Sequence, residues 1–235
     1  WEKADMERTL LLKAIPNTFT YYFIKASKTG IYDEASFENF KKAYQINSSF
    51  VPMYDALLSC YETLELNRIK RAEINQKWFD SGTYSPGLLS VGYNYLISLE
   101  QNAILITQGD NDTYPLWMLQ DVKKIRPDVT IINQHLMCIS TYAKLIFKDL
   151  GLLYTSSTQR ILEGEIGSFG SEKRLIVMKA LIKVLVSQKK YPIYFTNGNS
   201  SITEDIKDNL YLLGIVSVYS KEPIDRVSII KKNYE

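Results

Sequence analysis

The segment Ala103-Ile-Leu-Ile-Thr-Gln-Gly-Asp-Asn-Asp-Thr-Tyr-Pro-Leu-Trp117 joins a short apolar run to a polar cluster and a helical pattern. The apolar run stops at a glycine, two carboxylates and a carboxamide, and Thr113 and Pro115 then signal a helix from about Tyr114. Open parallel sheets place their ligand crevices at the carboxyl ends of buried strands. The segment therefore predicts a buried strand, a site at its end and a helix after it.

Strands and helices alternate after this segment. The apolar run at 129–133 is unbroken, as expected for a strand that helices cover on both faces. The predicted strands are 103–107, 129–133, 192–196 and 215–219, and the predicted helices are 114–124, 140–150, 172–189 and 202–213. Gly151 and Gly214 are placed to end two of these helices. We expect residues 83–235 to form a Rossmann-like, three-layer α/β domain with a mostly parallel sheet.

Residues 1–82 read as helical and end in a turn-rich segment, after which Ser85 and Pro86 begin a helix that runs to about Leu99. Two helical hairpins carry the spacing of packing residues found in tetratricopeptide repeats. These residues are Phe23, Ile24, Ser27, Ser36, Phe40 and Ala43 in the first hairpin and Tyr54, Leu57, Leu58 and Tyr61 in the second. The pattern resembles one and a half to two repeats, the second degenerate, and such repeats bind partner proteins. The alternative is that the hairpins only pack on the neighbouring domain.

Composition excludes two classes of function. A formal net charge of +2 with scattered lysine doublets gives no basic patch for nucleic acid. No apolar run is long enough for a membrane-spanning segment. The chain opens at Trp1 without Met, so a removed leader or anchor remains compatible with it. Cys60 and Cys138 lack metal-site spacing; free thiols are favoured over a disulfide, which would require an oxidising compartment.

An internal echo locates the candidate site. The segments 104–111 and 193–200 share an apolar run, a threonine, a polar residue, a glycine and a further Asp or Asn. If both strands lie parallel in one sheet, both polar turns open at the same edge. The candidate ligand-binding residues are Asp110, Asn111, Asp112, Asn197, Asn199 and His135.

Two interpretations of these residues stay open. Asp110 and Asp112 carry oxygen donors that suit Mg²⁺, Mn²⁺ or Ca²⁺, so they are candidate metal ligands. Alternatively, Asp112 or Thr113 caps a helix, which would leave Asp110, Asn111 and Asn197 without a structural role. His135 follows a predicted strand and is either a general base or a structural histidine.

The same residues carry a resemblance to a known family. The shared motifs are Gly109-Asp-Asn-Asp-Thr-Tyr-Pro-Leu-Trp117, Arg126-x-Asp128-Val129, Ile131-Ile-Asn133, Pro192-Ile-Tyr-Phe195 and Tyr211-Leu-Leu-Gly214. Over about residues 85–222 the chain is similar to the soluble C-terminal region of a bacterial envelope family of membrane proteins that resemble protein O-mannosyltransferases. The resemblance implies a Rossmann-like fold and a setting in the periplasm or cell envelope.

The chain also departs from that family. The membrane half, to which the resemblance assigns glycosyl transfer, is not part of this sequence. Where the family continues with Asn-Thr-Asp-Trp-Tyr, this chain has Cys138-Ile-Ser-Thr-Tyr142. We therefore expect a non-catalytic accessory or adaptor module that binds a partner protein or a larger envelope complex through its helical repeats. The alternative is a metal-assisted enzyme, or the remnant of one, that acts on glycan or sugar phosphate.

Overall fold

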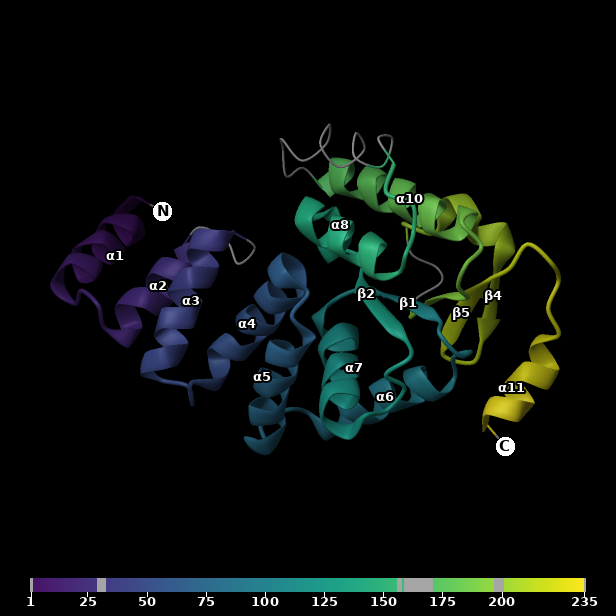
Figure 1. The fold of residues 1–235 in the computed structure, drawn as a ribbon, viewed down its shortest axis with the longest axis horizontal. Coiled ribbons are helices and arrows are strands. Elements are labelled where there is room, and N and C mark those ends of the chain that lie inside the picture. The colour runs from purple at the N-terminus through teal and green to yellow at the C-terminus, as the bar shows by residue number, and fades with distance from the viewer. Residues whose placement is uncertain (1, 29–32, 156–157, 159–170, 197–200, 235) are drawn as a thin grey trace. The chain divides into compact units, whose positions relative to one another are not determined.

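The structure, a computed structural model, describes residues 2–28, 33–155, 158, 171–196 and 201–234. The chain divides into two compact units, Trp1–Thr83 and Tyr84–Glu235. The first unit is helical, and the second contains a five-stranded, mostly parallel sheet (Figure 1). The predicted fold class, mixed α/β with N-terminal helices, is thus confirmed.

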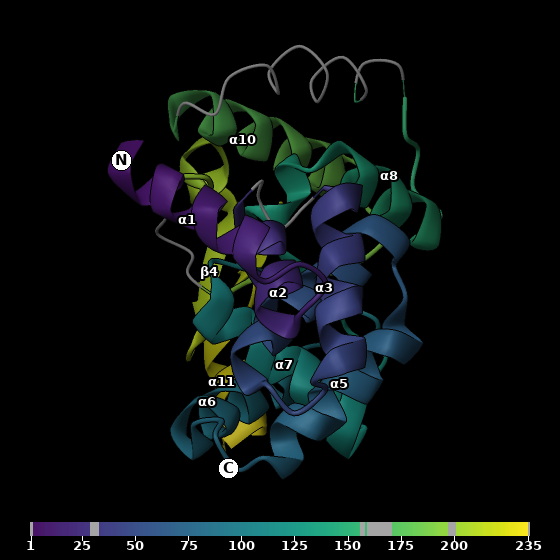
Figure 2. The same cartoon turned by 90° about the vertical axis from the view of Figure 1, so that its left-hand side faces the viewer.

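The helical unit is built from short helices. Its elements are α1 (Glu2–Ala14), α2 (Phe19–Lys28), α3 (Glu34–Ile46), a 3₁₀ turn (Val51–Met53), α4 (Tyr54–Cys60), a π-helical turn (Tyr61–Glu65) and α5 (Arg68–Asp80). Figure 2 shows α2 and α3 side by side as a hairpin. Asp33 caps α3 by accepting a hydrogen bond from the Ser36 N–H at 2.9 Å, and Asn67 caps α5.

The residues compared with tetratricopeptide repeats contribute to the core of this unit. Phe40, Ala43, Leu57 and Leu58 are each at most 2% exposed. Such burial is expected of any helical hairpin that packs along one face, so the repeat assignment stays a prediction. The core also holds an ion pair, in which Arg71 Nη1 lies 2.6 Å from Glu62 Oε2 with both side chains buried.

The sheet of the second unit has the strand order β2-β1-β3-β5-β4. The strands are β1 (Ile104–Thr107), β2 (Thr130–Asn133), β3 (Ile193–Phe195), β4 (Leu210–Leu213) and β5 (Val216–Tyr219). β1 pairs in parallel with β2 and with β3, whereas β5 runs antiparallel to both β3 and β4. The two echoing segments therefore form neighbouring parallel strands, with Ile104 opposite Ile193.

Helices cover the sheet on both faces. They are α6 (Pro86–Ile97), α7 (Asp110–Lys123), α8 (Ser140–Asp149), α10 (Ser171–Ser187) and α11 (Arg226–Tyr234), with 3₁₀ helices at Leu136–Cys138 and Glu204–Asn209. In Figure 1, α8 and α10 lie on one side of the sheet and α6 and α7 on the other, which makes three layers. The fully buried Trp117 of α7 and Tyr142 of α8 are among its largest core side chains.

Two of the predicted elements need correction. The predicted helix 202–213 is a 3₁₀ helix to Asn209 followed by strand β4, and Gly214 turns the β4–β5 hairpin at φ +72° instead of ending a helix. The helix expected from Tyr114 begins at Asp110, so the acidic cluster forms its first turn. Gly151 does follow helix α8, at φ +58°.

Arg126 ties the end of α6 to the start of β2. Its guanidinium donates to the backbone oxygens of Leu96 at 2.9 Å and Leu99 at 2.7 Å, and it forms a two-point ion pair with Asp128. The hydrogen bonds that Arg126 donates, with a further one from the Asn102 N–H and the Arg126 charge, lower the pKa of the Asp128 carboxyl to about 2. This contact accounts for the Arg126-x-Asp128 spacing as a structural feature.

Cys60 and Cys138 are free thiols. Burial raises the pKa of Cys60 to about 12, so this thiol stays protonated at neutral pH. Among the helices that the structure describes, none combines the length and apolar character needed to cross a membrane.

Candidate functional site

A groove of about 490 Å³ opens where strands β1 and β3 end. One wall is the apolar and aromatic face of α6, with Leu88, Val91 and Tyr95. The opposite wall is the turn after β1 and the first turn of α7 (108–112), and Thr196 after β3 completes the lining. The groove therefore has one wall suited to van der Waals contact and one rich in oxygen acceptors.

Asp112 holds the polar wall together. Its Oδ2 accepts a hydrogen bond from the Gln108 N–H at 2.8 Å, and its Oδ1 accepts one from the Gly109 N–H at 2.7 Å. The Thr196 hydroxyl donates a third hydrogen bond to Oδ2. A carboxylate at the third position of a helix commonly returns to the N-cap N–H in this way. Both oxygens of Asp112 are thus used to join β1, β3 and α7.

A buried polar network lies beneath this turn. The hydroxyls of Thr107 and Thr113 are 2.6 Å apart, and the Thr113 hydroxyl also receives a hydrogen bond from the Asn133 amide at 3.1 Å. The Asn133 Oδ1 in turn accepts the His135 N–H at 2.8 Å. Since the Thr107, Thr113 and Asn133 side chains are each at most 3% exposed, the network fixes the first turn of α7 against the ends of β1 and β2.

Asp110 and Asn111 have a different position. Both are exposed residues of the first α7 turn and line the groove. Pro115 has no N–H, so the Asn111 carbonyl lacks its usual helical donor four residues on. Burial and the negative charge of Asp110 together raise the pKa of Tyr84, which places that phenol within electrostatic range of the groove. Asp110 and Asn111 are therefore the side chains best presented to a ligand.

His135 lies after β2 and outside the groove lining. Its Nε2 is 3.2 Å from the Gln134 side-chain nitrogen. Desolvation and the positive charge of Arg174 lower the pKa of His135, and the charges of Asp110 and Asp112 oppose this shift. His135 therefore lies within electrostatic range of both aspartates without lining the groove.

The structure brings part of the predicted site together. Asp110, Asn111 and Asp112 share one groove, whereas Asn197 and Asn199 lie outside the described residues. In the described part of the chain, no group of three or more His, Cys, Asp and Glu side chains is arranged to hold a metal ion.

Six lining residues were not predicted as site residues: Leu88, Val91, Tyr95, Gln108, Gly109 and Thr196. Gln108 and Thr196 each directly follow a strand, and Thr196 is the counterpart of Thr107 in the echo, so their spacing carried a signal. Tyr95 lies on α6, and nothing in the local sequence connects that helix to the strand ends. Burial and the Asp112 charge raise the pKa of Tyr95.

No curated protein and no solved structure matches the chain. Among protein-family models, residues 88–147 match the one described as TMEM260-associated domain 2. The matched residues run from α6 into α8 and include most of the groove. This part of the chain is thus similar to a family linked to a membrane protein, in general agreement with the resemblance that its motifs carry.

Proposed function

We propose that this chain is a non-catalytic accessory or adaptor module of the bacterial cell envelope. In this proposal the helical unit binds a partner protein, and the α/β unit holds a polar ligand on Asp110 and Asn111. The observation that carries the proposal is that the carboxylate of Asp112 accepts three hydrogen bonds from groups of the protein itself, through both of its oxygens.

A general base, a nucleophile or a cation ligand needs a lone pair that is free to meet the substrate or ion. Three of the about four lone pairs of the Asp112 carboxylate instead accept the N–H groups of Gln108 and Gly109 and the hydroxyl of Thr196. Breaking these bonds would release the turn that shapes the groove. What remains for a ligand is one carboxylate, Asp110, and one carboxamide, Asn111, which suit recognition by hydrogen bonding.

The outer face of α1 supports binding of a partner protein by the helical unit. Met6 and Leu10 are each 61% exposed and lie one helical turn apart, and Leu11 is 43% exposed beside them. An exposed apolar stripe of this kind is typical of a surface that another protein covers. Helical hairpins stacked in short arrays offer such surfaces to partners.

The envelope setting rests on similarity. The Gly109–Thr113 block resembles the soluble region of an envelope family, and residues 88–147 match a domain described as associated with TMEM260. Both similarities support the proposal that the chain acts beside a membrane protein, in the periplasm or elsewhere in the cell envelope.

Site-specific photo-crosslinking in a bacterium that expresses the chain tests this proposal. A photoreactive amino acid replaces Leu10, and the control carries it at Arg8, which is exposed and turned about 160° around the helix. We expect one discrete crosslinked protein in the envelope fraction from position 10 and a much weaker product from position 8. Equal products from both positions, or none from position 10, would contradict the proposal.

The alternative is a metal-assisted enzyme, or a remnant of one, that acts on glycan or sugar phosphate. It is favoured by the combined influence of Asp110 and Asp112 on the pKa of His135, which places a possible base within their field. In this alternative a cation would bind Asp110 and the acceptor position of Asp112 Oδ1 that N–H groups do not use, or would displace the hydrogen bonds of Asp112. It predicts that Mg²⁺, Mn²⁺ or Ca²⁺ raises the unfolding midpoint of the wild type and not that of Asp110→Asn.

A further inference from the structure

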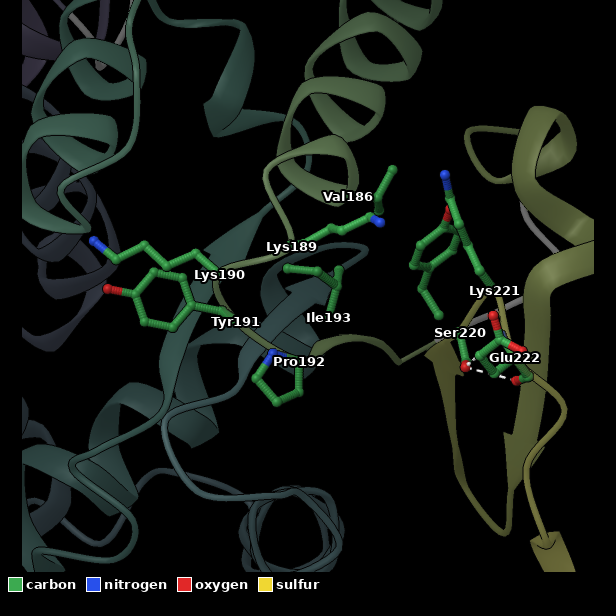
Figure 3. A pocket seen from close by; sticks show the side chains of 10 residues that line it. Val186, Lys189, Lys190, Tyr191, Pro192, Ile193, Ser220, Lys221 and Glu222 are labelled. Carbon is green, nitrogen blue, oxygen red and sulfur yellow. Dashed lines mark hydrogen bonds between the residues drawn. The ribbon is translucent and has the colours of Figure 1, made fainter.

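A second pocket lies at the opposite end of strand β3. It has a volume of about 460 Å³ and lies at the amino end of this strand, away from Thr196. Its lining comes from three segments: Val186 of α10, the link and strand start at 189–193, and the residues 219–222 that end and follow β5 (Figure 3). It therefore shares no lining residue with the groove of Asp110 and Asn111.

The charge of this pocket is positive. Lys189, Lys190 and Lys221 line it, with Glu222 as the carboxylate among the lining residues. Lys190 already has a structural task, because its Nζ donates to the backbone oxygens of Leu150 at 2.7 Å and Gly151 at 3.1 Å. In Figure 3 the Lys190 side chain points away from those of Lys189 and Lys221.

Lys189 and Lys221 make no such hydrogen bonds in the part of the chain that the structure describes. Within the described residues, neither ammonium group has a hydrogen bond, an ion pair or a ring contact. Figure 3 shows both side chains extending along the same open region, from two segments far apart in the sequence. Two ammonium groups so placed repel each other unless an anion lies between them.

The backbone at Lys189 has a local explanation. Its φ is +50°, in the left-handed region that glycine adopts freely and that strains a lysine. Lys124 and Arg126 also have left-handed backbones, and their side chains donate to carbonyl groups, as in the 2.7 Å contact from Lys124 Nζ to the Asp121 oxygen. Lys189 lies two residues beyond the end of α10, where a left-handed residue commonly ends a helix, so its backbone is explained locally while its ammonium group stays unused.

We propose that this pocket binds a small organic phosphate ester. Lys189 and Lys221 hold the phosphate, since lysine ammonium groups bind phosphate as compact point charges. The volume of 460 Å³ exceeds what a phosphate ion fills and lies in the range of small-molecule sites. Tyr219 and Pro192 supply the apolar surface against which the organic part of the ester packs.

Isothermal titration calorimetry of the full chain with glucose 1-phosphate, at constant ionic strength, tests the proposal. We expect measurable binding that becomes weaker by roughly tenfold or more in Lys189→Gln/Lys221→Gln. The matched control is Lys148→Gln/Lys231→Gln, which removes two exposed lysines that do not line the pocket and should leave binding unchanged. Glu222→Gln should bind more tightly, because it removes the carboxylate of the lining.

Other outcomes overturn the proposal. No binding by the wild type, or equal weakening by the control pair, would show that the two pocket lysines do not form a site. Glucose that binds as tightly as its phosphate would exclude the phosphate as the recognised group. Inorganic phosphate that binds as tightly as the ester would exclude the organic part. Since none of these residues belongs to the groove at the other end of β3, the result is independent of the proposed function.

Discussion

Replacing Asp112 with asparagine separates the structural role of this side chain from a ligand-binding role. An asparagine side chain keeps one acceptor oxygen and exchanges the other for an NH₂ group. Whichever way the amide turns, its NH₂ group faces a backbone N–H, of Gln108 or of Gly109, that is left without an acceptor. The remaining hydrogen bonds lose the assistance of a full negative charge.

The cost follows from these losses. One lost charge-assisted hydrogen bond and the lost carboxylate at the helix N-terminus together come to about 2–4 kcal/mol of unfolding free energy. For a domain of roughly 150 residues, that lowers the unfolding midpoint by about 4–16 °C. Asp110→Asn loses only the interaction with the helix dipole, about 0.3–1 kcal/mol, so its midpoint should fall by at most about 4 °C.

Thermal unfolding followed by circular dichroism in buffer with a chelator measures both variants and the wild type. Asp208→Asn serves as the charge control, since Asp208 is exposed on the 3₁₀ helix and lies outside the groove. The reasoning is refuted if Asp112→Asn unfolds within about 2 °C of Asp110→Asn, since the hydrogen bonds to Asp112 would then contribute nothing measurable.

Three further predictions concern the scaffold. The lowered pKa of Asp128 means that its ion pair with Arg126 stabilises the fold above about pH 4 and loses about 1–2 kcal/mol as the pH falls towards 2; acid titration of Asp128→Asn should lack this loss. Glu62→Gln should cost about 3–5 kcal/mol in urea unfolding because it removes the negative charge that neutralises the buried Arg71, whereas Glu62→Leu/Arg71→Met should recover most of that; equal single and double costs would contradict this. Gly92→Leu should cost about 1–3 kcal/mol in the same assay, since even a Cβ at Gly92 would lie 3.3 Å from α7 side-chain atoms; an unchanged midpoint would show that α6 and α7 can separate freely.

The strands could be predicted from the sequence because their signals are local. The runs at 103–107 and 129–133 are apolar, β-branched in part and bounded by polar turn residues, and the structure has strands at Ile104–Thr107 and Thr130–Asn133. The interpretation of the echo between 104–111 and 193–200 depended on both strands lying parallel in one sheet, and β1 and β3 do pair in parallel. The sequence of an element was sufficient to predict it wherever that element buries an apolar face of its own.

The error at 202–213 has a physical cause. Ile202, Ile206, Leu210 and Leu213 recur at helical spacing, which favoured a continuous helix. Pairing with β5 overrides that periodicity, and the Leu210–Leu213 segment extends as the first strand of a hairpin. Two apolar runs separated by Gly214 and one further residue were the hairpin signal that helical spacing concealed.

The site could be predicted only in part. The acidic cluster was located correctly at a strand end, but the sequence left open whether Asp112 caps a helix or binds a ligand. Its tie to Thr196 joins residues 84 positions apart, and such a contact has no local signal. Helix α6 brings Tyr95 to the groove through its packing in the folded domain, and the sequence pattern at the strand ends does not predict this packing.

The central claim is that the Asp112 carboxylate stabilises the groove through hydrogen bonds within the protein, and that the groove needs no divalent cation for its stability. The most direct test titrates the wild type, Asp110→Asn and Asp112→Asn with Mg²⁺, Mn²⁺ and Ca²⁺ while the unfolding midpoint is recorded. We predict midpoints that do not rise with any cation, and an Asp112→Asn deficit that is the same at every concentration. A midpoint that rises with cation concentration in the wild type and in neither variant would contradict the claim, because only a ligand bound to the native state has that effect.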